Sequence, residues 1–211
     1  LIFLTKSKSE SMKPFFYLLT LSVVLSSCSV NGTKYIYSYE LQNSTGNKNE
    51  YEDNSIFATF DVQTKMINFK IENLTDKALT VIWDESSFVI FNEANKAAHG
   101  ETKYINAEQT QVPTIIPPKA FLNDALLPIK NIGFSSGSKY SAGGWTLDYF
   151  LPVWDMDLKK NVDKILSAKG KTVGIFLPIE IDGIKNDYYF KFLITDVKKD
   201  KYPYRPQTVI D

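Results

Sequence analysis

The chain is poor in the residues that build metal centres and covalent cross-links. Among its 211 residues there is one cysteine, Cys28, and one histidine, His99. A single cysteine cannot form a disulfide within the chain, so stability has to come from the burial of apolar surface. A single histidine excludes zinc sites that take several histidines from one chain. We therefore expect no metal and no cofactor.

An excess of charge of one sign is also missing. The chain has 24 Lys and Arg residues against 24 Asp and Glu residues. Nucleic-acid binding depends on basic side chains that neutralise phosphates, so no nucleic-acid partner is expected. Gly143-Gly144 is not followed by the Lys-Ser or Lys-Thr of a phosphate-binding loop. These absences predict that the protein is not an enzyme.

The apolar run near the N-terminus is too short to span a membrane. It covers residues 14–24, about ten residues, whereas a membrane-spanning helix needs roughly twenty. Met12 and the basic Lys13 precede it, and small residues follow it, which is typical of a secretory signal peptide. We expect a targeting segment that is removed.

The end of this segment, Leu25-Ser26-Ser27-Cys28, resembles the lipobox of bacterial lipoproteins. The resemblance implies a diacylglycerol thioether on Cys28 and cleavage just before it. Two acyl chains are enough for stable attachment to a membrane. Ser29 follows the cysteine, and by analogy with enteric lipoproteins this favours the outer membrane of the cell envelope.

These segments predict the organisation of the chain. Cleavage before Cys28 would leave 211 − 27 = 184 residues, enough for one domain with a substantial core. The expected parts are an upstream extension (1–11), a signal peptide (12–27), a tether with a first strand and a polar loop (28–54), a β-sandwich domain (55–200) and a C-terminal tail (201–211).

Alternation of apolar and polar residues predicts a mainly β fold. The predicted strands cover residues 35–40, 56–60, 66–72, 79–83, 88–91, 121–129, 145–151, 172–181 and 187–197. Asp182-Gly183 between the last two is a strong hairpin signal. One short helix is predicted from Leu158 to Leu166, with Asp157 as N-cap and Lys169-Gly170 at its end. This pattern favours an antiparallel, two-sheet, immunoglobulin-like sandwich.

Three segments are predicted to be loops. Residues 42–54 are polar and lack apolar periodicity, and residues 134–145 are rich in Gly and Ser. Residues 92–119 contain Pro113, Pro117 and Pro118, which cannot donate hydrogen bonds to a sheet. We expect this long segment to pair at most at a sheet edge.

Four stretches resemble, in their order along the chain, a family of uncharacterised bacterial lipoproteins. They are WDESSFVIF (83–91), HGETKYI (99–105), PTIIPP (113–118) and TVGIFLPIEIDG (172–183). The resemblance covers residues 65–195 and implies an immunoglobulin-like sandwich and an envelope location. It implies no activity.

Few residue patterns suggest chemistry. His99 with Glu101 suggests a mixed metal site, although loop residues at this spacing more often organise local hydrogen bonds. Asp84 and Glu85 suggest acid–base catalysis, but neighbouring strand residues point to opposite faces. Asp155-Met156-Asp157 has the spacing of a calcium loop without the other ligands of one.

Two functions remain open from the sequence. The leading one is a membrane-anchored envelope protein that acts as a structural or protein-interaction module. The alternative is a glycan- or peptide-binding module that uses the 92–119 and 134–145 loops. Its expected binding residues are Trp145, Tyr149, Trp154 and Tyr104. A hydrolase would require the carboxylates of Asp84, Glu85, Asp148 and Asp155 to converge on one cleft.

Overall fold

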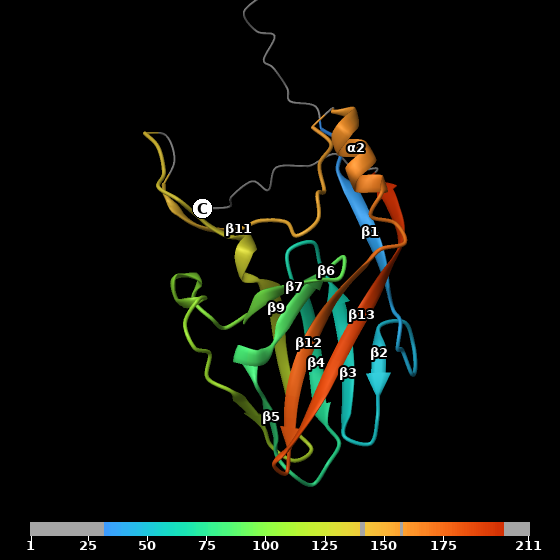
Figure 1. Cartoon of the computed structure of the whole chain (residues 1–211), viewed down its shortest axis with the longest axis vertical. Coiled ribbons are helices and arrows are strands. Elements are labelled where there is room, and N and C mark those ends of the chain that lie inside the picture. Colours follow the sequence, from blue (N-terminus) through green and yellow to red (C-terminus); the bar gives the residue numbers. More distant parts are fainter. Residues whose placement is uncertain (1–31, 140–141, 157, 201–211) are drawn as a thin grey trace, which may run out of the picture. The chain divides into compact units, whose positions relative to one another are not determined.

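The computed structural model describes residues 32–139, 142–156 and 158–200 (Figure 1). Cys28, the predicted signal peptide and Asp157 lie outside the described residues. This part of the chain is mainly β, with one α-helix, and none of its helices is long and apolar enough to cross a bilayer.

The strands are β1 (Tyr35–Leu41), β2 (Glu50–Glu52), β3 (Ile56–Val62), β4 (Ile67–Asn73), β5 (Leu79–Val81), β6 (Ser87–Ile90), β7 (Glu93–His99), β8 (Thr114–Ile116), β9 (Phe121–Pro128), β10 (Ile132–Ser135), β11 (Gly144–Leu147), β12 (Thr172–Ile181) and β13 (Ile184–Lys199). The helices are α2 (Lys159–Leu166) and the 3-10 turns η1 (Trp83–Glu85), η2 (Tyr104–Asn106) and η3 (Ile129–Asn131).

Most strands form one continuous antiparallel ladder. Its order is β1-β13-β12-β6-β7-β9-β4-β3-β2, and β5 joins β12 to β8. Strand β7 connects two layers, because residues 93–96 pair with β6 and residues 97–99 pair with β9. The ends of the ladder meet at Asn49, whose Oδ1 atom accepts the Leu41 N–H and whose carbonyl accepts the Phe60 N–H, each at 3.1 Å. The sheet is therefore nearly closed and barrel-like.

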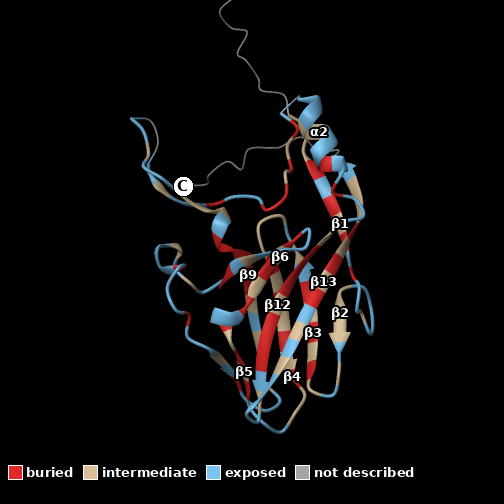
Figure 2. Ribbon diagram, viewed as in Figure 1, coloured by how far each residue is buried: buried red, intermediate tan, exposed pale blue. Residues whose placement is uncertain are grey.

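The core lies between the layers, where buried residues alternate along the strands (Figure 2). Alternate residues of β1 and β4 are buried, namely Tyr35, Tyr37, Tyr39, Ile67, Phe69 and Ile71. Phe60 of β3 packs on Phe190 and Phe192 of β13, with ring centroids 4.5 and 5.3 Å apart. Each buried aromatic ring of this kind contributes about 2–3 kcal/mol of hydrophobic stabilisation.

The predicted hairpin at Asp182-Gly183 is confirmed. Both residues have positive φ, 51° and 75°, which a two-residue turn of right-handed twist requires. Residues 172–181 of β12 pair with residues 184–193 of β13. Pro178 fits into central β12 because it lies between the residues that pair with β6 and those that pair with β5, where its missing N–H is not needed.

Several predicted element boundaries were wrong. Residues 50–52 of the predicted 42–54 loop form β2, and the predicted strand 79–83 ends at Val81 because η1 follows. The predicted strand 145–151 ends at Leu147. For α2 the N-cap is Leu158, without a side-chain hydrogen bond.

The two long loops also contain strands. β7 lies within the 92–119 segment, and each of its residues pairs on one side only, 93–96 with β6 and 97–99 with β9, which agrees with the expected edge pairing. Its sequence, EANKAAH, has no apolar alternation that would predict a strand. Its extended conformation therefore depends on pairing with β6 and β9 and not on a local pattern. β10 and β11, which include parts of the 134–145 segment, form a separate two-stranded hairpin.

Candidate functional site

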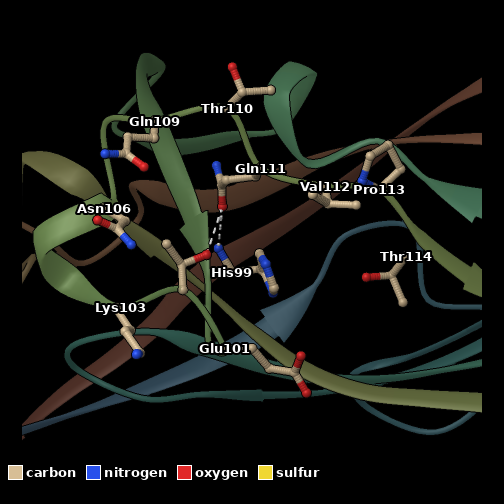
Figure 3. Close-up of a pocket in the computed structure, with 11 residues that line it drawn as sticks. His99, Glu101, Lys103, Asn106, Gln109, Thr110, Gln111, Val112, Pro113 and Thr114 are labelled. Carbon is tan, nitrogen blue, oxygen red and sulfur yellow. Dashed lines mark hydrogen bonds between the residues drawn. The ribbon is translucent and has the colours of Figure 1, made fainter.

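The segment between β7 and β8 surrounds a polar pocket of about 520 Å³ (Figure 3). Its lining residues are His99, Glu101, Thr102, Lys103, Asn106, Gln109, Thr110, Gln111, Val112, Pro113 and Thr114. Polar groups dominate this lining, and they come from one continuous stretch of chain. The pocket therefore suits a polar ligand better than an apolar one.

Gln111 fixes this segment to the sheet. Its Oε1 atom accepts the His99 N–H (3.0 Å) and the Thr102 hydroxyl (3.2 Å), and its Nε2 donates to the Ala97 carbonyl (2.9 Å). The Gln111 N–H donates to Asp84 Oδ1 at 2.7 Å. The Gln111 side chain is buried. Its amide therefore pairs with the backbone N–H of His99 and the carbonyl of Ala97, which would otherwise need a neighbouring strand as partner.

His99 is held in a defined orientation at the floor of the pocket. Its Nδ1 lies 3.0 Å from Asp124 Oδ2, and its ring stacks on Trp83 with centroids 4.7 Å apart and planes 12° apart. The Trp83 Nε1–H donates to the Thr114 hydroxyl at 2.8 Å. The Asp124 contact favours the tautomer with the proton on Nδ1, which leaves Nε2 as an acceptor.

The Asp124 carboxylate is itself positioned by the backbone. Its Oδ1 accepts the Gly100 N–H (2.9 Å) and the Ala125 N–H (2.7 Å). A Cβ atom at Gly100 would lie only 3.0 Å from this oxygen, so the close approach depends on glycine. The sequence reasoning missed Asp124, although an acidic residue within the apolar strand β9 was a signal for it.

This arrangement provides an oriented hydrogen-bond acceptor on the His99 ring. No group of three or more His, Cys, Asp or Glu side chains suitable for a metal ion occurs among the described residues. Glu101 lines the same pocket as His99, but Asp124 is the carboxylate that contacts the imidazole. The described residues therefore offer no third ligand for a metal site at His99 and Glu101.

The carboxylates considered for a hydrolase are held in separate places. Asp84 accepts the Gln111 N–H, whereas Glu85 forms an ion pair with Lys185. Asp155 accepts the Thr33 N–H and the Tyr35 hydroxyl, and Asp148 is exposed. Asp84, Glu85 and Asp155 thus have local structural roles, and the four carboxylates do not line one of the described pockets.

The four predicted binding aromatics are distributed over the domain. Trp145 and Tyr149 are exposed, whereas Trp154 packs partly buried against the main core. Tyr104 packs partly buried against a second, smaller core. Only Trp145 and Tyr149 are thus available as the binding hypothesis requires.

An exposed partner for Trp145 was missed from the sequence. Phe134 on β10 lies opposite Trp145 on β11, with ring centroids 5.2 Å apart. Phe134 is 63% exposed and Trp145 is 44% exposed. The two residues are eleven positions apart, and the pairing of β10 with β11 brings them together.

The pocket segment and the hairpin share the second core. This core consists of Ala98, Ala107, Leu127, Ile129 and Leu147, with Met66, Tyr104 and Ile132 packed against it. Tyr104 belongs to the pocket segment, and Ile132 and Leu147 belong to the hairpin. The structure therefore connects the two segments that the sequence reasoning proposed as a joint binding surface.

Comparison with known proteins does not identify this chain. No protein-family model, curated protein or solved structure matches it.

Proposed function

We propose that the chain is a lipid-anchored protein of the bacterial cell envelope, in which the β domain acts as a structural or protein-interaction module and not as an enzyme. The observation that carries this proposal is Leu25-Ser26-Ser27-Cys28 at the end of a short apolar segment. A thiolate is a good nucleophile towards an activated lipid donor, and small residues before it allow an extended chain to enter a peptidase. The outer membrane is the proposed destination.

The described domain is compatible with an anchor at Cys28. Its first strand, β1, begins at Tyr35, seven positions after the cysteine, and β1 pairs along its length with β13. Attachment of lipid to Cys28 would thus leave every described strand intact. We include an immunoglobulin-like sandwich in the proposal, because two antiparallel layers that pack face to face through aromatic residues support it.

The direct test is intact-mass analysis of the protein purified from its native envelope, together with its distribution between membrane and soluble fractions. We expect an N-terminal, acylated Cys28 in the membrane fraction. Cys28→Ala should carry no lipid and should leave the membrane. Ser27→Ala is the matched control, because it keeps a small residue before the cysteine and should remain acylated. A native protein with an unmodified cysteine would overturn the proposal.

A second function is favoured by the exposed aromatic pair on the β10–β11 hairpin. Phe134 and Trp145 form an exposed apolar surface, and Tyr149 nearby in sequence has the Lys65 ammonium 4.9 Å from its ring centroid. Exposed aromatic rings of this kind stack on sugar rings or on peptide side chains. The polar pocket at His99 would supply hydrogen bonds beside them. A glycan- or peptide-binding module is the function that these features support.

Isothermal titration calorimetry with soluble cell-wall glycan fragments, and separately with envelope-derived peptides, tests this second function, because the signal does not depend on Trp145 itself. Trp145→Ala should weaken binding at least tenfold, because the loss of one stacked aromatic costs about 1.5 kcal/mol. Phe121→Ala is the matched control, since Phe121 is an exposed aromatic residue on β9, outside the hairpin. Equal loss in both variants, or no binding of either ligand class, would exclude the hairpin as the site.

A further inference from the structure

The end of the domain where the described chain begins carries exposed apolar residues beside lysines that have no ion pair among the described residues. Met156 is 50% exposed and Leu158 is 58% exposed, and Lys159 and Lys160 follow at the start of α2. Neither lysine forms an ion pair with a carboxylate of the described residues, although Lys34, Lys169 and Lys198 at this end do. These four residues, Met156, Leu158, Lys159 and Lys160, are called the basal surface below.

The start of the described chain is fixed beside the basal surface. The Thr33 N–H donates to Asp155 Oδ1 (2.8 Å), and the Asp155 N–H donates to the Thr33 carbonyl (3.2 Å). A Cβ atom placed on Gly32 would lie 3.5 Å from the Met156 nitrogen and 3.7 Å from its Sδ atom. The chain therefore enters the domain directly next to Met156.

The distance from this entry point to the proposed anchor is short. Gly32 is four positions after Cys28, and four extended residues span at most about 14 Å. A lipid on Cys28 would consequently hold the basal surface within about two Debye lengths of the membrane at physiological salt. Such a short tether also gives a high effective concentration of the membrane at this surface.

The composition of the basal surface fits an anionic membrane. The α2 sequence, KKNVDKIL, has three lysines against one aspartate, a local excess of two positive charges in a chain of zero formal net charge. The buried Ile165 holds α2 on the core, so its position is fixed. Lysines attract anionic headgroups, and exposed Met and Leu side chains enter the boundary between headgroups and acyl chains.

We propose that the basal surface docks on the anionic lipid surface that carries the anchor, and so sets the orientation of the domain. This proposal rests on the lipid anchor proposed for Cys28. The docked domain would hold the Asp182–Gly183 turn away from the membrane, because β12 is ten residues long, or about 30 Å. The exposed Ile184 next to that turn would then face the periplasmic or extracellular medium.

Amide hydrogen exchange of the acylated full protein in vesicles tests the docking. One set of vesicles is phosphatidylcholine alone, and the other contains two parts phosphatidylcholine to one part phosphatidylglycerol. The acyl chains hold the protein on both, so a difference between them reports docking and not anchoring. We expect slower exchange in α2 only with phosphatidylglycerol, and loss of the slowing at high salt.

Substitutions locate the contact. Lys159→Gln with Lys160→Gln should lower the ratio of docked to undocked protein about fivefold per lysine, which corresponds to about 1 kcal/mol each at an anionic surface. Leu158→Ser should lower it further. The matched controls are at the opposite end of β12, where Lys77→Gln with Lys185→Gln and Ile184→Ser should leave the exchange of α2 unchanged.

Failure of the docking and failure of the anchor have different signatures. If the native protein carries no lipid on Cys28, the anchor proposal fails, and the docking is then tested with the single thiol coupled to a maleimide lipid. Equal exchange of α2 in both kinds of vesicle, with the lipid present, overturns the docking alone. Slower exchange in native membranes but not in protein-free vesicles also overturns it, and would assign the basal surface to a protein partner.

Discussion

Two tyrosines on β1 allow a matched test of how buried hydroxyl groups contribute to stability. Tyr37 and Tyr39 lie on the same face of the strand, each is 6% exposed, and their rings stack with centroids 6.3 Å apart. The Tyr37 hydroxyl donates to the Pro152 carbonyl at 2.5 Å. The Tyr39 hydroxyl is buried and has no hydrogen-bond partner among the described residues. The same substitution to phenylalanine should therefore have opposite effects at the two positions.

The magnitudes follow from the two environments. A buried polar group without a partner costs about 1–3 kcal/mol, and Tyr39→Phe removes that cost while leaving only a small void. We expect a gain of about 1 kcal/mol in the free energy of unfolding, or about 2–4 °C in Tm for a domain of this size. Tyr37→Phe should lose about 1 kcal/mol, because it leaves the Pro152 carbonyl unpaired.

Urea unfolding followed by circular dichroism measures both changes. The transition midpoints should move in opposite directions while the slopes stay equal, which indicates a change in stability and not in the denatured state. If Tyr39→Phe destabilises the protein as much as Tyr37→Phe, the Tyr39 hydroxyl has a partner such as a buried water molecule, and the reasoning is refuted.

Three further predictions concern the clamp of the pocket, a close approach of strands and the response to alkali. Gln111→Leu should speed amide exchange in residues 100–113 and cost about 2 kcal/mol, because buried partners lose their hydrogen bonds; unchanged exchange there would show that Gln111 is not the clamp. Gly174→Ala should cost about 1–3 kcal/mol, since the new Cβ would lie 2.6 Å from the Phe190 carbonyl oxygen, whereas Gly144→Ala meets nothing within 4 Å and should change stability by less than about 0.5 kcal/mol. Burial raises the pKa of Tyr37 from 10.0 to about 12, so the stability it contributes is complete below pH 10 and is lost as the pH rises towards 12. The urea midpoint should fall as the pH rises from 10 to 12, and it should fall less in Tyr37→Phe than in the wild-type protein. An equal fall in both proteins would contradict a raised pKa for Tyr37.

Local sequence was sufficient where one segment carries the whole signal. Alternation in β4 identified Ile67, Phe69 and Ile71 as inward residues, because a half-buried strand needs an apolar residue at every second position. Asp182-Gly183 identified the β12–β13 turn, because few residues tolerate two successive positive φ angles. The lipobox-like Leu25–Cys28 is also a signal within one short segment, and the lipidation of Cys28 stays a prediction.

The candidate site depended on contacts that no local pattern contains. His99 and Asp124 are 25 positions apart, and they meet only because β7 pairs with β9. In the sequence, nothing distinguishes Gln111 from the other polar residues of its loop. In the structure it is buried and fixes the pocket segment to the sheet. Long-range pairing decides which polar groups are buried together, and hydrogen bonding then decides their roles.

The sequence by itself thus determined the β class, the inward faces of the regular strands and the hairpin turn, and the attachment of the N-terminus to a membrane is a prediction from it. Only the tertiary structure decided that β7 joins two layers, that Phe134 meets Trp145, and that Met156 and Leu158 lie where the tether enters the domain. The physical reason is that periodicity and turn chemistry act over a few residues, whereas strand pairing between distant segments depends on how the whole core is packed.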